Sequence, residues 1–407
     1  MASDRELFEL RNGRVIMDED LSEKMYIIKS YHPEKADETS SGFEWSEMGM
    51  ANLFGMLYNR EARYCTEHKS WYTYFEGAWR KDEGAILVSE KIKDFVRLMI
   101  LYCGEIVDDE IRKAYTSFVN KMGDRRMRDR ILKDATGELR ISATEFDADP
   151  YLINCLNGTY SLRDFSFREA KWDDFLTMQT NFRHTVRRDI RCERWEQFID
   201  EVTQGDKDKA DFLQRSLGYS ILGMSNEECM FILHGKTTRN GKSTFWNTLS
   251  RVMGTYSGNM SADTLTVGCK RNVKPELAEA KGKRIIIAAE LEEGMRLNTS
   301  NVKQLCSTDE IYAEKKYKDP FSFVPSHTLV LYTNHLPKVG AIDAGTWRRL
   351  IVIPFNAKIE GSSDIKNYAD YLFNKAGGAI LKWIMTGAKR VIEKDYHIVK
   401  PAVVEAA

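Results

Sequence analysis

The chain has 407 residues, of which 43% are hydrophobic and 30% charged, and its formal net charge is −1. This length allows two or three domains, and the composition is that of an ordinary globular protein. No apolar run approaches the roughly 18–20 residues of a membrane helix, and the charged N-terminus lacks a signal peptide's apolar segment, so we expect a cytosolic chain without a membrane partner. The balanced charge excludes a uniformly basic nucleic-acid binder, so any such contact needs a local basic patch.

The first half of the chain shows strand and helix signals in alternation. Aromatic, β-prone residues surround Glu76-Gly77 and predict a hairpin there. Apolar residues at three- and four-residue spacing predict helices over 88–133, which end in the basic run 121–133. Because that run alternates in charge sign, a solvated helix face is favoured over a DNA contact. The seven cysteines form no C-x-x-C pair, which predicts neither a disulfide framework nor a zinc site.

The strongest motif is MFILHGKTTRNGKSTFWNTLSRVMG at 230–254, in which an apolar strand leads through a glycine-containing loop into an amphipathic helix. This arrangement predicts a P-loop, whose backbone N–H groups and helix N-terminus enclose phosphate oxygens. Lys242 would reach the β- and γ-phosphates and the Ser243 hydroxyl would ligate Mg²⁺. The nucleotide-binding residues expected from the motif are Gly235, Asn240, Gly241, Lys242, Ser243 and Thr244.

The loop departs from the usual G-x-x-x-x-G-K-[ST] pattern. Five residues rather than four separate Gly235 from Gly241. Either the loop is one residue longer, or Lys236 occupies the first motif position. The roles of Lys242 and Ser243 are the same in both cases, while the role of Gly235 stays open.

Carboxylates follow a second predicted strand, Ile285 to Ala289, about fifty residues later. In an α/β nucleotide-binding core the end of such a strand lies beside the P-loop. We therefore expect Glu290 to hold Mg²⁺ through water and Glu292 to orient and deprotonate the attacking water.

Two further apolar strands complete the motif series. The strand through Leu329 to Leu331 ends in Thr333-Asn334, and an asparagine there can bond the γ-phosphate or the attacking water. Arg348 and Arg349 precede the last strand. One of them, preferably Arg348, would reach a neighbouring subunit's ATP as an arginine finger. An intrasubunit salt bridge is the alternative for either arginine.

A basic segment around an aromatic residue lies between the second and third strands. Lys315, Lys316 and Lys318 surround Tyr317 before the turn residues Asp319-Pro320. Such a segment suits a hairpin that grips a DNA backbone and a base. An exposed charged loop is an equal alternative on the residues alone.

The order of these motifs resembles the phage/plasmid primase family of superfamily 3 helicases, which includes the poxvirus primase-helicase. The segments that carry the resemblance are RNGKST, GKRIIIAAELEEG, YAEKKYKDPFSFVPS, LVLYTNHLP and WRRLIVIPF, with PYLINCLNGTYSLRD and FLQRSLGYSILG upstream. The likeness extends over about residues 60–380. It departs from the family at Ser307-Thr308-Asp309, where many relatives have Gly-Gly-Asp.

The resemblance implies an α/β, AAA+-like P-loop NTPase core with an α+β N-terminal domain and helical flanks. We expect an N-terminal domain over 1–205, an ATPase domain over 206–360 and a C-terminal helical segment over 361–407, the first boundary lying at the polar break Gly205-Asp206. The family's assembly is a ring, expected to be a hexamer, around single-stranded or forked DNA, with ATP at the subunit interfaces. A separate primase or origin-binding protein is a further expected partner.

The resemblance also implies the activity, an ATP-dependent DNA helicase of a phage, plasmid or integrated element. It places Lys315, Lys316 and Lys318 in the family's DNA-gripping hairpin. A DNA-binding or origin-loading factor that does not unwind is the alternative function, because the step from ATPase to helicase depends on the family.

Overall fold

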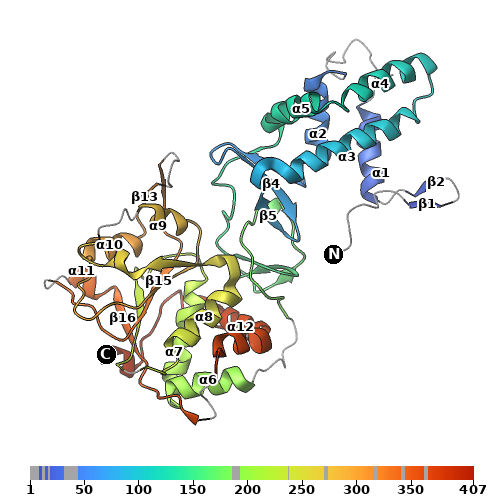
Figure 1. Ribbon diagram of the computed structural model, residues 1–407. Helices are drawn as coiled ribbons and strands as arrows, with labels where there is room; N and C mark the ends of the chain where they lie inside the picture. Colours follow the sequence, from blue (N-terminus) through green and yellow to red (C-terminus); the bar gives the residue numbers. More distant parts are fainter. Residues whose placement is uncertain are drawn as a thin grey trace. The chain divides into compact units, whose positions relative to one another are not determined.

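The computed structural model describes residues 9–11, 14–16, 19–31, 45–185, 193–236, 238–269, 274–314, 320–340, 344–361 and 365–407. The chain divides into two compact units, Met1–Phe146 and Asp147–Ala407 (Figure 1). None of the described helices combines the length and apolar character needed to cross a membrane.

The first unit combines helices with two small sheets. Its helices are α1 (Glu19–Ser30), α2 (Glu47–Tyr58), α3 (Ile86–Cys103), α4 (Asp109–Lys121) and α5 (Arg125–Glu138). Its strands are β1 (Glu9–Arg11), β2 (Arg14–Ile16), β3 (Ala62–Cys65), β4 (Ser70–Phe75), β5 (Ala78–Lys81) and β6 (Arg140–Ile141). The last four form a sheet in the order β5-β4-β3-β6, and β1 pairs with β2.

Local sequence explains several of these elements. Strands β4 and β5 pair antiparallel across Glu76-Gly77, and both turn residues have positive φ, 49° and 78°. Two positive φ values are what a two-residue hairpin turn requires, so the hairpin predicted there is confirmed. Asp108 and Asp124 accept bonds from the first backbone N–H groups of α4 and α5, which fixes where those helices begin.

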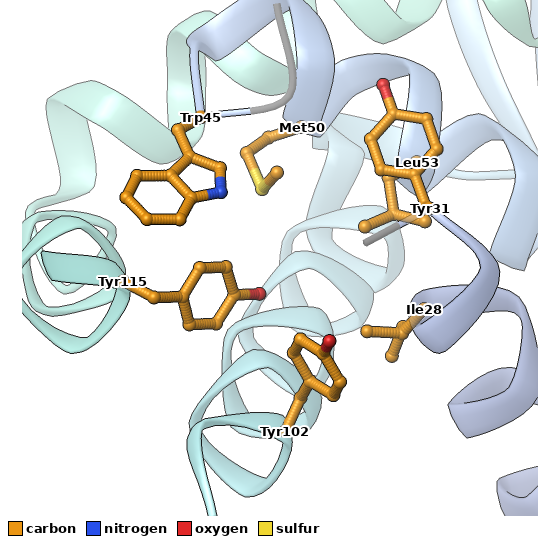
Figure 2. A pocket seen from close by; sticks show the side chains of 7 residues that line it. All are labelled: Ile28, Tyr31, Trp45, Met50, Leu53, Tyr102 and Tyr115. Carbon is orange, nitrogen blue, oxygen red and sulfur yellow. The ribbon is translucent and has the colours of Figure 1, made fainter. Parts of the chain in front are cut away.

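A small pocket lies within the first unit, and Figure 2 shows the side chains that line it. All of them are aliphatic or aromatic: Ile28, Tyr31, Trp45, Met50, Leu53, Tyr102 and Tyr115. The tyrosine rings of 102 and 115 meet edge to face, with centroids 5.5 Å apart. Because it lacks a carboxylate, a histidine and a cationic side chain, we interpret this pocket as part of the apolar core.

The second unit contains a parallel sheet covered by helices. Its strands are β7 (Leu152–Cys155), β8 (Gly158–Ser161), β9 (Phe167–Arg168), β10 (Met230–His234), β11 (Ser257–Ser261), β12 (Ile285–Ala289), β13 (Ile311–Ala313), β14 (Phe321–Phe323), β15 (Thr328–Thr333) and β16 (Leu350–Pro354). Its helices are α6 (Glu193–Thr203), α7 (Lys207–Ser220), α8 (Lys242–Met253), α9 (Lys274–Glu279), α10 (Thr299–Leu305), α11 (Ala344–Trp347), α12 (Tyr368–Ile392) and α13 (Ala402–Glu405).

The central sheet has five parallel strands in the order β11-β12-β15-β10-β16. Alternate residues of β10 enter different cores: Phe231 and Leu233 pack with α7, α8 and α12, while Met230 and Ile232 pack with residues of α9 and α10. Figure 1 shows these two helical layers on opposite sides of the sheet. A strand that is buried on both faces consists of consecutive apolar residues, which explains why these strands are recognisable in the sequence.

Helices from both ends of the second unit form one layer on the sheet. Helix α12 packs along α7 and α8, and a Cβ atom on Gly218 of α7 would collide with the backbone at Gly387 of α12. The reciprocal Cβ on Gly387 would collide with the Gln214 carbonyl. The two helix backbones therefore meet directly, which requires glycine at both positions.

The predicted domain boundary at residue 205 falls inside the second unit, whose first residue is Asp147. Gly205 has φ 76°, and Asp206 caps α7 with a side-chain bond to Lys209 N–H. The polar break is therefore a turn between α6 and α7, which share one core with the central sheet. Helix α12, expected as a separate C-terminal segment, also belongs to this core.

Candidate functional site

Three of the predicted site residues directly follow strands of the central sheet. Gly235 follows β10, Glu290 follows β12 and Asn334 follows β15. Since β15 lies between β10 and β12 and all three are parallel, the carboxyl ends of these strands meet at one edge of the sheet. We call this the carboxyl edge, and the opposite end of the strands the amino edge.

Lys242 is the charged group at the centre of the carboxyl edge. Its side chain is buried, and its Nζ donates to Gly235 O at 3.1 Å, Asn240 Oδ1 at 3.0 Å and Asn334 Oδ1 at 2.9 Å. All three acceptors are neutral, and Lys242 has no salt bridge within the described residues. Burial lowers the pKa of Lys242, and the charge of Glu290 partly opposes this effect. An anion at this place would supply the missing counter-charge.

The loop before Lys242 approaches other backbone closely. A Cβ atom on Gly235 would collide with the Phe355 carbonyl, and one on Gly241 would lie 2.5 Å from Val202 Cγ1. Gly241 has φ 84° and gives α8 no side-chain cap. The first N–H groups of this 12-residue helix therefore lack a capping side chain, and the positive end of the helix dipole favours an anion beside them. The Gly235 carbonyl accepts a bond from Lys242, while its place in the motif stays a prediction.

Glu290 stands at the end of β12 in a constrained backbone. It has φ 58°, in the left-handed region, and its N–H donates to Tyr332 O at 3.0 Å. Leu291 N–H contacts Thr333 Oγ1 at 3.4 Å, which ties the acidic segment to β15. The Glu290 side chain is exposed, as are Glu292 and Ser243, while Thr244 is half-buried. A residue held in a left-handed conformation is commonly found where function fixes the backbone.

The donor set fits a metal held mainly by a phosphate ligand. Within the described part of the chain, no three or more His, Cys, Asp or Glu side chains are grouped to hold a metal ion. Ser243 and Glu290 offer one hydroxyl and one carboxylate beside the Lys242 loop. Mg²⁺ usually binds through one or two protein ligands, water and substrate phosphates, so these residues fit a Mg²⁺–triphosphate pair better than an isolated ion.

Two basic groups near the loop, the half-buried His234 and the buried Lys209, were not predicted. Burial lowers the pKa of His234, the last residue of β10. Lys209 is 3% exposed; its Nζ donates to Val202 O at 3.3 Å and lies 5.3 Å from the centre of the Phe355 ring. Burial lowers the pKa of Lys209 to about 8. The contacts of Val202 and Phe355 with Gly241 and Gly235 place Lys209 behind the loop, but no motif in the sequence indicates it.

The predicted DNA-gripping hairpin is described only at its base. Strands β13 and β14 pair antiparallel, with Ala313 opposite Phe321, and Figure 1 shows them projecting from the second unit. Lys281 Nζ lies 5.1 Å from the centre of the Phe321 ring. The residues predicted to contact DNA, Lys315, Lys316, Tyr317 and Lys318, lie outside the described residues.

The two arginines lie at the amino edge, away from Lys242. Both pair with Glu228: Arg348 through one terminal nitrogen, and Arg349 at 2.9 Å. Arg349 also donates to Gly345 O at 2.7 Å. The structure therefore contains the intrasubunit salt bridge that the sequence left as an alternative. It brings Lys242 and Asn334 together, places Glu290 nearby and separates both arginines from this group.

Comparisons with known proteins find similarity to viral proteins. Two family models match, "D5 N terminal like" over residues 51–204 and a family of unknown function, DUF5906, over residues 233–349. The helicase-named protein L207/L206 of Acanthamoeba polyphaga mimivirus is 32% identical over 217 residues, or 52% of this chain and 22% of that protein. Primase D5 of fowlpox virus is 23% identical over 260 residues, or 60% of this chain and 32% of that protein.

These matches support a phage and viral primase-helicase family, the resemblance that the motifs indicated. The chain's N-terminal part is of the D5 N terminal like type. The chain spans less than a third of the length of the curated relatives named here. A solved structure of the C-terminal region of NrS-1 aligns with 88% of this chain and 74% of that one, at 10% identity and a TM-score of 0.49.

Proposed function

We propose that this chain is the ATP-hydrolysing motor of a replicative helicase from a phage, virus, plasmid or integrated element. The observation that carries the proposal is the buried Lys242 ammonium, which has three neutral oxygens as partners and lies at the uncapped start of α8. A triphosphate is the ligand chemistry that fits a buried cation, a glycine-containing loop and a helix N-terminus together. The proposal therefore includes a P-loop NTPase core of the superfamily 3 type.

The residues of the carboxyl edge divide the work of hydrolysis in this proposal. Lys242 and the N–H groups of residues 240–244 bind the phosphates, and Asn334 moves from Lys242 to the γ-phosphate or the attacking water. Glu292 orients and deprotonates that water. Ser243 and, through water, Glu290 would hold Mg²⁺, which neutralises charge on the phosphates when bound.

The assembly and the nucleic acid are part of the same proposal. The relatives are named for a helicase and a primase, which supports DNA as the partner. Arg348 lies at the opposite edge of the sheet from Lys242, so it can act only on the ATP of another copy. Such a head-to-tail contact closes into a ring when the rotation permits, and a hexamer is our proposed ring. Lys315 to Lys318 would then face the DNA strand.

The experiment measures ATP hydrolysis at fixed salt, with and without single-stranded DNA, for the wild type and Lys242→Ala. We expect DNA-stimulated turnover that falls by about 100- to 1,000-fold in the variant, the scale typical of losing one group that stabilises transition-state charge. Lys375→Ala, which removes an exposed lysine on α12, is the matched control and should keep wild-type turnover.

Strand displacement on a forked duplex then separates the motor from a loading factor. Turnover with displacement supports the helicase, and turnover without displacement supports the loader. Folded protein that binds no ATP, or a Lys242→Ala variant with wild-type turnover, would contradict the proposal.

A further inference from the structure

We propose that Glu228 is a positioning residue for Arg348: it holds the guanidinium on its own subunit until the ATP of a neighbouring copy displaces it. This inference rests on the proposed function and adds a control step to it. Hydrolysis would then require assembly for two reasons. A neighbouring copy must place its ATP near Arg348, and that ATP must also displace Arg348 from the Glu228 carboxylate of the same subunit.

The two arginines differ in their freedom to move. The Arg349 side chain is 10% exposed and is fixed by Glu228 and the Gly345 carbonyl. The Arg348 side chain is 64% exposed, and Glu228 is its only partner in the described part of the chain. Arg348 can therefore leave the ion pair while Arg349 keeps Glu228 in place. An exposed ion pair contributes little stability, so a stronger anion can replace it.

The backbone holds the Glu228 carboxylate at a fixed position. Glu228 has φ 45°, in the left-handed region, a conformation that glycine or asparagine adopts with less strain than glutamate. Its N–H donates to Ser225 O at 2.8 Å, and the N–H of Glu227 donates to the Tyr219 hydroxyl at 2.9 Å. Ser225 Oγ in turn donates to Pro325 O at 3.1 Å. These hydrogen bonds hold the turn, and with it the backbone from which the Glu228 carboxylate reaches Arg348 and Arg349.

The register of the sheet shows that Arg348 and Lys242 of one subunit lie at opposite edges of the central sheet. Met230 pairs with Leu350 at the amino edge, and His234 pairs with Pro354 at the carboxyl edge. Four residue steps along a strand span roughly 13 Å. Arg348 precedes this strand and Lys242 follows the other end, so Arg348 can reach the phosphate site only of another copy. A γ-phosphate presented by that copy competes with Glu228 for the same guanidinium, and it forms charge-assisted bonds with it.

The test compares Glu228→Gln with Glu227→Gln. Glutamine has the shape of glutamate and still accepts a bond from Arg349, but it removes the charge that holds Arg348. Glu227 is its sequence neighbour and accepts from His397 Nδ1 at 3.0 Å, so it controls for the loss of one carboxylate. Two quantities are measured against protein concentration: ATP turnover per subunit, and nucleotide-dependent self-association by sedimentation velocity.

We expect Glu228→Gln to lower the concentration of half-maximal association and turnover by about 3- to 10-fold, a change of roughly 0.7–1.4 kcal/mol. Glu227→Gln should match the wild type. In an Arg348→Ala background, Glu228→Gln should have no further effect, because the arginine that it releases is absent. If Glu228→Gln unfolds, Glu228→Asp is used instead: its shorter side chain should favour the buried Arg349 and shift the midpoint in the same direction.

Other outcomes overturn the inference. It fails if Glu228→Gln and Glu227→Gln have equal midpoints, or if the effect persists without Arg348. Wild-type protein that associates but does not turn over ATP contradicts the proposed function, while the association midpoints still test Glu228. Protein that does not associate with nucleotide at any concentration overturns the role of Glu228 as well, since there is no neighbour to displace it.

Discussion

The two edges of the central sheet differ in how their cationic side chains are paired. At the carboxyl edge, Lys242 has three neutral oxygen partners and no carboxylate at ion-pair distance within the described residues. At the amino edge, Arg348 and Arg349 are already paired with Glu228. A buried cation without a counter-ion marks a place where an anionic ligand binds, whereas a closed ion pair marks a place where a ligand has to compete.

A change at Gly241 tests whether the carboxyl edge depends on its backbone geometry. Gly241→Ala puts a Cβ 2.5 Å from Val202 Cγ1 at φ 84°, so we expect a loss of about 3 kcal/mol in the free energy of unfolding and at least tenfold weaker ATP binding. Gly268→Ala is the control, because Gly268 has φ 92° and open space around it, and should lose only about 1 kcal/mol. Urea unfolding measures the stability of the two variants, and ATP titration measures their affinity for ATP. Equal losses of stability in Gly241→Ala and Gly268→Ala would mean that the contact with Val202 has no role.

A second prediction concerns the pH dependence of stability at the amino edge, where the buried His327 precedes β15. Both ring nitrogens are buried without a partner among the described residues, and burial lowers the pKa of His327 from 6.5 to about 4. Between these two pH values the unfolded chain binds a proton that the folded chain does not, so stability falls as pH falls through this window. We expect the wild type to lose about 2 kcal/mol relative to His327→Phe between pH 7.5 and pH 5. Parallel stability curves for the two proteins would show that the histidine is protonated normally.

The two arginines offer a smaller and sharper comparison. Arg349→Met removes a guanidinium that is bonded inside the protein, and we expect a loss of about 1–2 kcal/mol in the free energy of unfolding. Arg348→Met removes an exposed partner and should change stability by less than about 0.5 kcal/mol. Urea unfolding of both variants measures the difference. A larger loss for Arg348→Met would assign it a structural role and weaken its proposed action on a neighbouring subunit.

Much of the sheet could be predicted from the sequence. The run Ile285–Ala289 is apolar because both faces of β12 are buried, and the strand has these bounds. The runs at β10 and β15 are recognisable for the same reason. The segments that directly follow such runs lie at one edge of a parallel sheet, which is why the loop after β10, Glu290 after β12 and Asn334 after β15 lie at the same edge.

Long-range partners could not be predicted. Glu228 and Arg348 are 120 residues apart, and neither the turn around Glu228 nor the strand after Arg349 indicates the other. The break at Gly205-Asp206 shows the opposite problem: its local signals are genuine, since Asp206 caps a helix. A turn between two helices of one core has the same sequence signals as a linker between domains, so the local pattern cannot distinguish them.

The contact between Gly218 and Gly387 has a practical consequence for work with fragments of the chain. Residues 207–220 and 368–392 precede and follow the strands of the central sheet, yet their backbones touch and their side chains share one core. A recombinant fragment limited to residues 206–360, the range that the motifs suggest, would omit α12 and leave the apolar faces of α7 and α8 exposed to water. We expect such a fragment to aggregate on expression, and a fragment of residues 147–407 to be the better starting material for nucleotide-binding studies.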